Sequence, residues 1–338
     1  MPALVSHMAA LVHGFDVASA GELRCALDAG MSRDGISFAG PGKRRDELLQ
    51  AVAAGVLINV ESFREIRILG DILKESDLRA RVAVRVNPTF ELKASGMRMG
   101  GGAKPFGVDA ELVLELLREI DQSKLRFEGF HIFCGSQSLQ TDAICESHSR
   151  ALDLGLLLAR ESLHGIETMN IGGGLGIPYS SSQKGVEISS ITANLRSLAN
   201  KLIEAFPNAK LVMELGRYLV GEGGIYVCRV LDRKVSRGKV FLVTDGGLHH
   251  HLAASGNFGQ ILRRNFPIRV GSATAGPGRE VVTVVGPLCT PLDVIADNVV
   301  LPTMREGDLL VVLQSGAYGL TASPVRFLDH PLPKELLI

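Results

Sequence analysis

Three consecutive glycines are the first feature of this chain that could bind a ligand. Gly172, Gly173 and Gly174 follow the apolar residues 169–171, and consecutive glycines let backbone N–H groups approach and wrap an anion such as a phosphate. The spacing is not that of a dinucleotide-binding GxGxxG loop, and no Gly-Lys-Ser/Thr follows to make a P-loop. The triplet therefore predicts an anion site or, alternatively, a tight turn between a strand and a loop.

A second charged stretch follows the apolar run 211–213 and contains Glu214, Gly216 and Arg217. A carboxylate in that place can pair with a protonated ring nitrogen. The Gly-Arg pair can offer a backbone N–H and a positive charge to a phosphate or a carboxylate. The alternative interpretation is an ion pair between Glu214 and Arg217 on the surface.

Histidine and cysteine are the remaining residue types with metal or redox chemistry. His249, His250 and His251 are adjacent, but consecutive histidines point in different directions and no carboxylate or cysteine stands at ligand spacing. We expect no metal there and a loop at the rim of an active site instead. The five cysteines include no CxxC pair, which is typical of reduced thiols in the cytoplasm.

Length and charge restrict the class of protein. The 338 residues suffice for one large α/β barrel and a smaller domain, and 46% of them are hydrophobic. Lys+Arg and Asp+Glu are both 36, so we expect neither a nucleic-acid surface nor a basic membrane patch. No apolar run approaches the roughly 18 residues that span a bilayer, and the first residues do not resemble a secretory signal. A cytoplasmic protein is expected.

The first two thirds of the chain alternate short apolar runs with amphipathic segments such as 44–49 and 110–117. This alternation is typical of βα units with a parallel sheet, whose active-site residues follow the strands. The predicted strands number seven: 14–17, 36–39, 57–60, 82–86, 127–133, 169–171 and 211–214.

Seven strands are one fewer than a closed (β/α)8 barrel needs. Only a short helical piece, residues 4–12, precedes the first of them, so we predict a barrel that lacks its first strand. A half-open barrel or another doubly wound sheet is the alternative. Residues 222–338 change to short apolar runs broken by Gly, Pro and Asp, which predicts a C-terminal antiparallel β domain after a barrel domain of residues 1–221.

Taken in order, nine stretches resemble the fold-type III pyridoxal-phosphate decarboxylases that act on ornithine, arginine and diaminopimelate. The similarity is greatest to the branches linked to exosortase gene clusters and to aminoacyl groups held on carrier proteins. It covers essentially the whole chain, and its stretches are 14–23, 40–43, 85–88, 104–108, 135–136, 172–174, 214–217, 286–289 and 316–319.

This resemblance implies pyridoxal 5'-phosphate (PLP) as cofactor and a role for each matching residue. Glu214 would face the pyridine nitrogen and keep it protonated, while Asp16 and Arg85 would line the cofactor. Cys289 would be catalytic and enter from the partner subunit of a two-fold homodimer with shared active sites; the alternative is a buried structural thiol. The PLP phosphate would be held by Ser136, Gly172, Gly173, Gly174, Gly216 and Arg217, with Tyr318 closing on it.

Three departures from the family pattern affect the expected chemistry. The family's PLP-binding lysine lies on the first barrel strand, before the part that this sequence matches, so this chain is expected to lack that lysine and to be inactive. Lys43 matches a second lysine that the family carries alongside the PLP-binding one. Phe133 stands where the family has a histidine stacked on the ring, and an aromatic face can still stack there. Thr290 replaces the acidic residue that pairs with a distal substrate amine, and the Arg-Pro-x-x-Tyr element is absent.

The function implied by the resemblance is α-decarboxylation of a small amino acid or of an aminoacyl thioester on an acyl-carrier protein. Amino-acid racemisation on the same fold, and a truncated or inactive homologue that binds PLP without a lysine linkage, are the alternatives. Thr290 favours a neutral, acidic or thioester-linked side chain over a cation, and Arg263 and Arg264 offer charge for an acidic substrate or a phosphopantetheine, or are surface charges.

Overall fold

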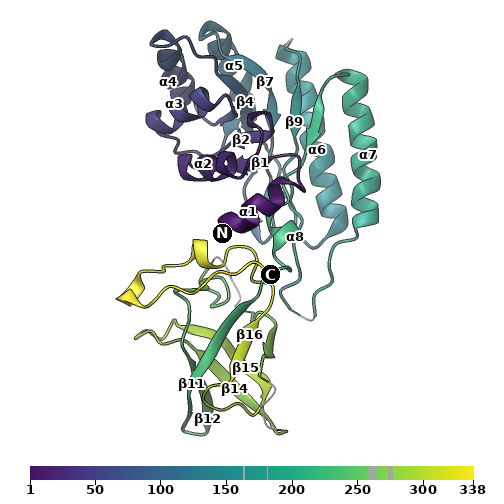
Figure 1. Ribbon diagram of the computed structural model, residues 1–338. Helices are drawn as coiled ribbons and strands as arrows, with labels where there is room; N and C mark the ends of the chain where they lie inside the picture. Colours follow the sequence, from purple (N-terminus) through teal and green to yellow (C-terminus); the bar gives the residue numbers. More distant parts are fainter. Residues whose placement is uncertain (163, 181, 259–263, 273–276) are drawn as a thin grey trace. The chain divides into compact units, whose positions relative to one another are not determined.

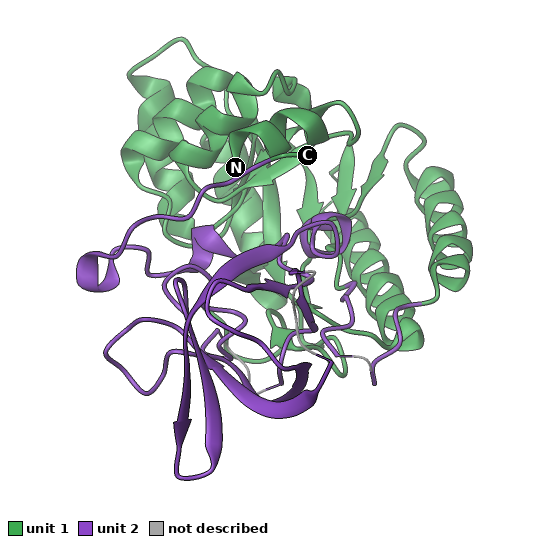
Figure 2. Cartoon of the chain, turned by 60° about the horizontal axis from the view of Figure 1, so that its bottom comes forward, with its two compact units in different colours: residues 1–174, 187–214, 337–338 green, residues 175–186, 215–336 purple. Residues whose placement is uncertain are grey.

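A computed structural model describes residues 1–162, 164–180, 182–258, 264–272 and 277–338. Within them the chain divides into two compact units (Figure 2). Unit 1 comprises residues 1–174, 187–214 and 337–338, and unit 2 comprises residues 175–186 and 215–336.

Unit 1 is a parallel sheet with helices along it, as the alternating pattern predicted (Figure 1). Its strands run in the order β1-β2-β3-β4-β7-β9-β10, and the short β6 pairs with β4 as well. Their bounds are Phe15–Val17 (β1), Ile36–Phe38 (β2), Leu57–Val60 (β3), Arg81–Asn87 (β4), Val108–Asp109 (β6), Arg126–His131 (β7), Thr168–Asn170 (β9) and Lys210–Val212 (β10).

The sheet is open: in the described part of the chain, β1 pairs only with β2, and β10 pairs only with β9. The seven predicted strands are therefore confirmed, and so is an incomplete barrel. A small antiparallel pair, β5 (Met97–Arg98) with β8 (Gly135–Ser136), lies apart from this sheet.

Local signals in the sequence place the helices of unit 1. Ser19 and Ser62 each accept a hydrogen bond from the backbone three residues ahead and so cap α2 and α4, and Gly55 ends α3 in a left-handed conformation. The helices are α1 (Pro2–Ala9), α2 (Ala20–Asp28), α3 (Arg45–Ala54), α4 (Phe63–Lys74), α5 (Val113–Gln122), α6 (Thr141–Ser162) and α7 (Ile188–Ala205).

Unit 2 begins its regular structure with α8 (Gly216–Val220) and continues into a six-stranded sheet of order β13-β16-β11-β12-β14-β15. The expectation of a purely antiparallel domain is corrected, because β12 and β14 run parallel. A parallel neighbour needs a long crossover, and residues 245–278 provide one. The bounds are Tyr226–Ser236 (β11), Lys239–Thr244 (β12), Ile268–Val270 (β13), Arg279–Val285 (β14), Val294–Pro302 (β15) and Leu309–Val312 (β16).

A bulge in β7 depends on Gly129. The pairing with β4 shifts between Phe127 and Gly129, so that Glu128 is the extra residue. Gly129 has a φ of +150°, and a Cβ there would overlap the carbonyl oxygen of Thr168 in β9. Only glycine therefore fits between these two strands.

We expect Gly129→Ala to lower the free energy of unfolding by roughly 3 kcal/mol or more, because backbone strain and overpacking add. Gly30→Ala is the matched control, since Gly30 also has a positive φ of +85° but meets nothing within 4 Å; its loss should be about 1 kcal/mol. Urea unfolding of both variants measures the difference. Equal losses would show that the contact with Thr168 is unimportant.

Candidate active site

Polar side chains gather where the parallel strands of unit 1 end. Arg85, His131 and Asn170 lie at or near the last residues of β4, β7 and β9, and Glu214 follows β10. Because parallel strands end at the same edge of a sheet, these residues and Asp16 of β1 belong to one edge, where such folds carry their active sites.

Glu214 is held in its ionised form by two neighbours. The Nδ2 of Asn170 donates to the Oε1 of Glu214 at 2.6 Å, and the Nε2 of His131 lies 3.0 Å from the same oxygen. Burial alone would raise the pKa of Glu214, but His131 and Asn170 outweigh it and lower that pKa. The site therefore keeps a carboxylate with little access to water, as a protonated ring nitrogen would require.

Asn170 and His131 were not among the predicted site residues. Asn170 also accepts a hydrogen bond from the Gly172 N–H at 2.9 Å through its Oδ1, so one side chain positions both Glu214 and the glycine triplet. Its place directly after a strand and before the glycines was a usable signal. The pairing of His131 with Glu214 has no signal in the sequence, because the two residues lie far apart along the chain.

The glycine triplet forms a cradle that no side chain could enter. A Cβ on Gly173 would overlap the carbonyl oxygen of Glu214, and one on Gly174 would lie 2.9 Å from a methyl carbon of Leu92. The carbonyl of Gly173 accepts a hydrogen bond from the Nε2–H of His148 at 2.7 Å. No described residue accepts a hydrogen bond from the N–H of Gly173 or Gly174, so both remain available to an anion.

Gly216, Arg217 and Tyr318, three further predicted phosphate residues, lie in unit 2. Gly216 starts α8, and Arg217 donates to the hydroxyl of Tyr179 at 2.6 Å. The guanidinium of Arg217 also lies over the ring of Tyr318 at 4.4 Å from its centre. Arg217 and Tyr318 are therefore brought together as expected. That they share one phosphate with the glycine triplet stays a prediction.

Arg85 belongs to a buried charge network behind the site. It pairs with Glu61 at 2.9 Å and lies over the ring of Phe106. Glu61 in turn accepts hydrogen bonds from the N–H groups of Gly40 and Gly107, and its pKa is lowered because Arg85 and Lys43 outweigh the effect of burial. The network therefore fixes two loops as well as Arg85.

Lys43 is fully engaged in the same region. Its ammonium group donates to the carbonyls of Gly40 at 2.6 Å and Asn59 at 2.9 Å and pairs with Glu65 at 3.1 Å. The side chain is 1% exposed. Two hydrogen bonds and a buried ion pair therefore hold the Lys43 ammonium group within the protein.

The remaining predicted residues occupy different surroundings. Phe133 lies edge-on to His131, with ring centres 6.5 Å apart, and Ser136 pairs with Met97 through β8. Cys289 is an exposed thiol in unit 2, which contradicts the alternative of a buried structural cysteine. Arg263 lies outside the described residues. Within the described part of the chain no group of histidine, cysteine and acidic residues could hold a metal ion.

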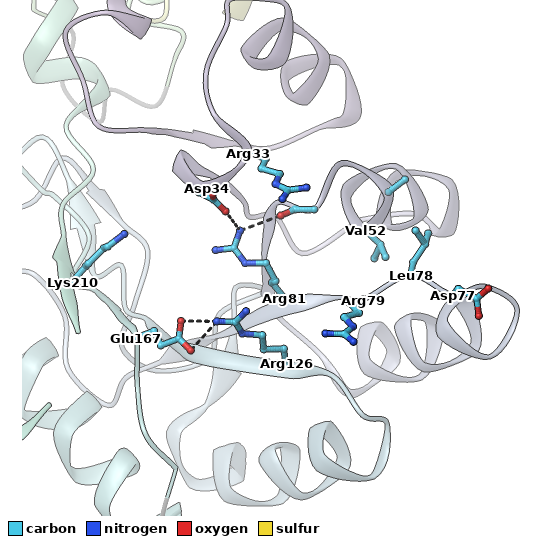
Figure 3. A pocket seen from close by; sticks show the side chains of 12 residues that line it. Arg33, Asp34, Val52, Asp77, Leu78, Arg79, Arg81, Arg126, Glu167 and Lys210 are labelled. Atoms are coloured by element: carbon cyan, nitrogen blue, oxygen red, sulfur yellow. Dashed lines mark hydrogen bonds and ion pairs between the residues drawn. The ribbon is translucent and has the colours of Figure 1, made fainter. Parts of the chain in front are cut away.

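A cavity of about 680 Å³ lies at the other end of the parallel sheet (Figure 3). Arg81, Arg126 and Lys210 are the first residues of β4, β7 and β10. Arg81 pairs with Asp34 and Arg126 with Glu167, at 2.9 and 2.8 Å. This cavity therefore lies at the amino ends of the strands, and its paired charges indicate a structural role.

Asp16 has the most perturbed carboxyl of the site. Loss of water around it and the neighbouring Glu214 raise its pKa to about 7, against a lowering by His131 and by the hydroxyl of Ser37, which donates to it at 2.6 Å. The Asp16 side chain is nevertheless exposed at the open edge of the sheet, so solvent screens its charge and reduces the energetic effect.

The pH dependence of stability should reveal this carboxyl. The folded protein holds the Asp16 proton more tightly than the unfolded chain, whose value is 3.8, so ionisation destabilises the fold progressively from about pH 4 to 7. We expect Asp16→Asn to match the wild type near pH 4 and to be more stable at pH 8 by about 1 kcal/mol. Urea unfolding across this range is the measurement, with Asp28→Asn, an exposed residue at the end of α2, as control. A difference that does not change with pH would contradict the assignment.

Comparison with known proteins identifies the family of this chain. The family described as "Pyridoxal-dependent decarboxylase, pyridoxal binding domain" matches residues 1–221. The L-glutamyl-[BtrI acyl-carrier protein] decarboxylase of Niallia circulans is 41% identical over 332 residues, which are 96% of this chain and 77% of that protein. The diaminopimelate decarboxylase of Campylobacter jejuni is 32% identical over 327 residues, covering 95% and 77%.

The fold comparison leads to the same family. A crystal structure of diaminopimelate decarboxylase from Helicobacter pylori complexed with L-lysine has a TM-score of 0.85 at 26% identity, and the match covers 98% of this chain and 80% of that one. No helix in the described residues is long and apolar enough to cross a bilayer. The chain therefore belongs to the family of pyridoxal-dependent decarboxylases.

Proposed function

We propose that this pyridoxal-dependent decarboxylase acts on a glutamate-like group that is held on a carrier protein through its side-chain carboxyl. This linkage leaves the α-carboxylate free to depart as carbon dioxide. The observation that carries the proposal is Thr290, an uncharged residue directly after Cys289, together with the relative that acts on a carrier-bound glutamyl group. A free diamino acid would leave its distal ammonium without a carboxylate partner, and an unpaired buried charge is strongly unfavourable.

The described residues fit PLP. Gly173 and Gly174 present N–H groups to which no described residue bonds, and Glu214 is a partly buried carboxylate whose pKa is lowered. When bound, PLP supplies the electron sink that lets an α-carboxylate leave. Glu214 would hold the proton on the ring nitrogen, and Phe133 would offer an aromatic face to the ring.

The protein must also return a proton to the α-carbon. We assign this step to Cys289, whose exposed Sγ–H can donate to the carbon from which the carboxylate has left. The resemblance places this residue in the partner's active site, so the proposed active unit is a two-fold dimer. All five cysteines are free thiols, which fits a reducing compartment such as the cytoplasm.

We infer that the chain as given binds PLP without a covalent link to a lysine. The reason is that Lys43, the lysine of the matching Gly40–Lys43 stretch, bonds through its ammonium group to two backbone carbonyls and to the carboxylate of Glu65. Protein mixed with PLP and reduced with borohydride should carry no stoichiometric lysine adduct by mass spectrometry of its peptides. An adduct on Lys43, or on any other lysine in stoichiometric yield, would refute the inference.

Substrate choice is tested by exchanging the residue after Cys289. PLP-loaded protein should bind glutamyl pantetheine thioester better than ornithine, lysine or meso-diaminopimelate in calorimetric titrations. Thr290→Glu should tighten ornithine binding by about tenfold, because it adds the missing carboxylate. Thr290→Gln is the neutral control of similar size and should give no gain. Tightest binding of ornithine or diaminopimelate by the wild type would show that the proposed substrate is wrong.

A further inference from the structure

The three adjacent histidines of unit 2 have different hydrogen-bonding roles, and the proposed mechanism uses none of them. His250 donates from Nε2 to the carbonyl of Pro331 at 2.8 Å and accepts from the hydroxyl of Tyr226 at 3.2 Å through Nδ1. Both of its ring nitrogens are therefore engaged within the protein. Burial also lowers the pKa of His250, so this ring is a neutral structural element.

His251 is equally committed. The hydroxyl of Ser315 donates to the carbonyl of Val312 and therefore accepts from the Nε2–H of His251, at 2.9 Å. The Nδ1 of His251 accepts from the N–H of Ala254 at 3.2 Å. Burial lowers its pKa to about 4. His250 and His251 thus hold the loop that they belong to in one conformation.

His249 differs from both neighbours. Its side chain is buried, at 0% exposure, yet neither ring nitrogen has a hydrogen-bond partner among the described residues. Its ring lies between those of His250 and His330, with centres 3.9 and 5.2 Å away. A buried polar group left unpaired is unfavourable, so the two nitrogens of His249 point to a ligand.

The loop that carries His249 is joined to the loop that carries Cys289. The carboxylate of Asp293 accepts from the N–H of Leu248 at 2.6 Å and from the N–H of Leu288 at 2.9 Å. His249 and Cys289 are the residues that directly follow these two donors. Since β12 and β14 are parallel, both loops leave the sheet at the same edge. One carboxylate therefore ties together the two loops that carry His249 and the proposed proton donor.

The charge state of His249 indicates the kind of ligand. Burial, and then the nearby His250 and His330, lower its pKa to about 4, so at neutral pH the ring is uncharged and offers one N–H donor and one acceptor. A site for an ammonium group would need a carboxylate, and a site for a free carboxylate would need an arginine. A neutral N–H suits a neutral carbonyl oxygen.

We propose that His249 recognises the thioester end of a carrier-bound substrate. Its ring N–H would donate to the thioester carbonyl oxygen, at the position where the free amino acid has a carboxylate. This inference rests on the proposed function and names the residue that would distinguish acyl thioester from free acid. His250 and His251 position the loop, and Asp293 sets its place relative to Cys289.

The test uses PLP-loaded protein and two probes, free glutamate and the stable amide analogue of glutamyl pantetheine thioester. His249→Leu removes both ring nitrogens at similar volume, His249→Gln restores an N–H donor, and His330→Leu is the matched control that removes only a neighbouring ring. We expect His249→Leu to weaken the amide analogue about tenfold in calorimetric titrations and glutamate by less than about twofold. His249→Gln should recover most of the loss, and His330→Leu should show none.

A stability measurement separates this role from a structural one. Replacing an unpaired buried imidazole by an apolar side chain should leave the melting temperature of His249→Leu unchanged or higher, whereas a structural histidine would lower it. Equal weakening of both probes, or no weakening of either, would overturn the inference while the substrate proposal stands. If the wild type binds glutamate but not the amide analogue, the carrier-bound substrate itself is wrong and the role of His249 falls with it.

Discussion

The hydrogen bond between Asn170 and Glu214 is the interaction on which the site depends most. Together with His131, which has the larger effect, Asn170 lowers the pKa of Glu214 in a place where burial would raise it. The same asparagine accepts from Gly172 and so ties the anion cradle to the charged group. Because Gly173 has no room for a side chain beside the backbone of Glu214, the spacing between cradle and carboxylate is set by direct packing.

The two ends of the parallel sheet have different roles: the amino ends carry structural ion pairs, and the carboxyl ends carry the candidate active site. At the amino ends, Arg81 reaches Glu128 with two hydrogen bonds of 2.8 and 3.0 Å and so secures the extra residue of the β7 bulge. At the carboxyl ends, the charged residues Asp16, Arg85 and Glu214 lie near the glycine triplet, whose N–H groups can bind an anion. Asp16 and Glu214 are neighbouring carboxyls whose pKa values move in opposite directions, which is typical of groups with separate functions.

Unit 2 uses one buried carboxylate for a comparable purpose. Asp293 joins two loops from parallel strands through backbone N–H groups, and a Cβ on Gly247 would overlap its carboxylate. The loop after β12 and the loop with Cys289 therefore cannot move independently. In this arrangement one carboxylate fixes the position of the loop with Cys289 relative to the loop with the three histidines.

The sequence by itself determined where the helices and strands lie and which strands are followed by charged residues. Apolar periodicity and glycine runs are local signals, so they can be read without the tertiary structure. Seven parallel strands, an open barrel, Glu214 and the glycine cradle were all predictable in this way. The parallel pairing of β12 and β14, the Asn170 and His131 contacts of Glu214, and the isolation of His249 were decided by the tertiary structure. These depend on which distant segments meet. No local pattern distinguishes His249 from its two neighbours. The difference comes from distant partners: Pro331 and Tyr226 bond to His250, and Ser315 bonds to His251.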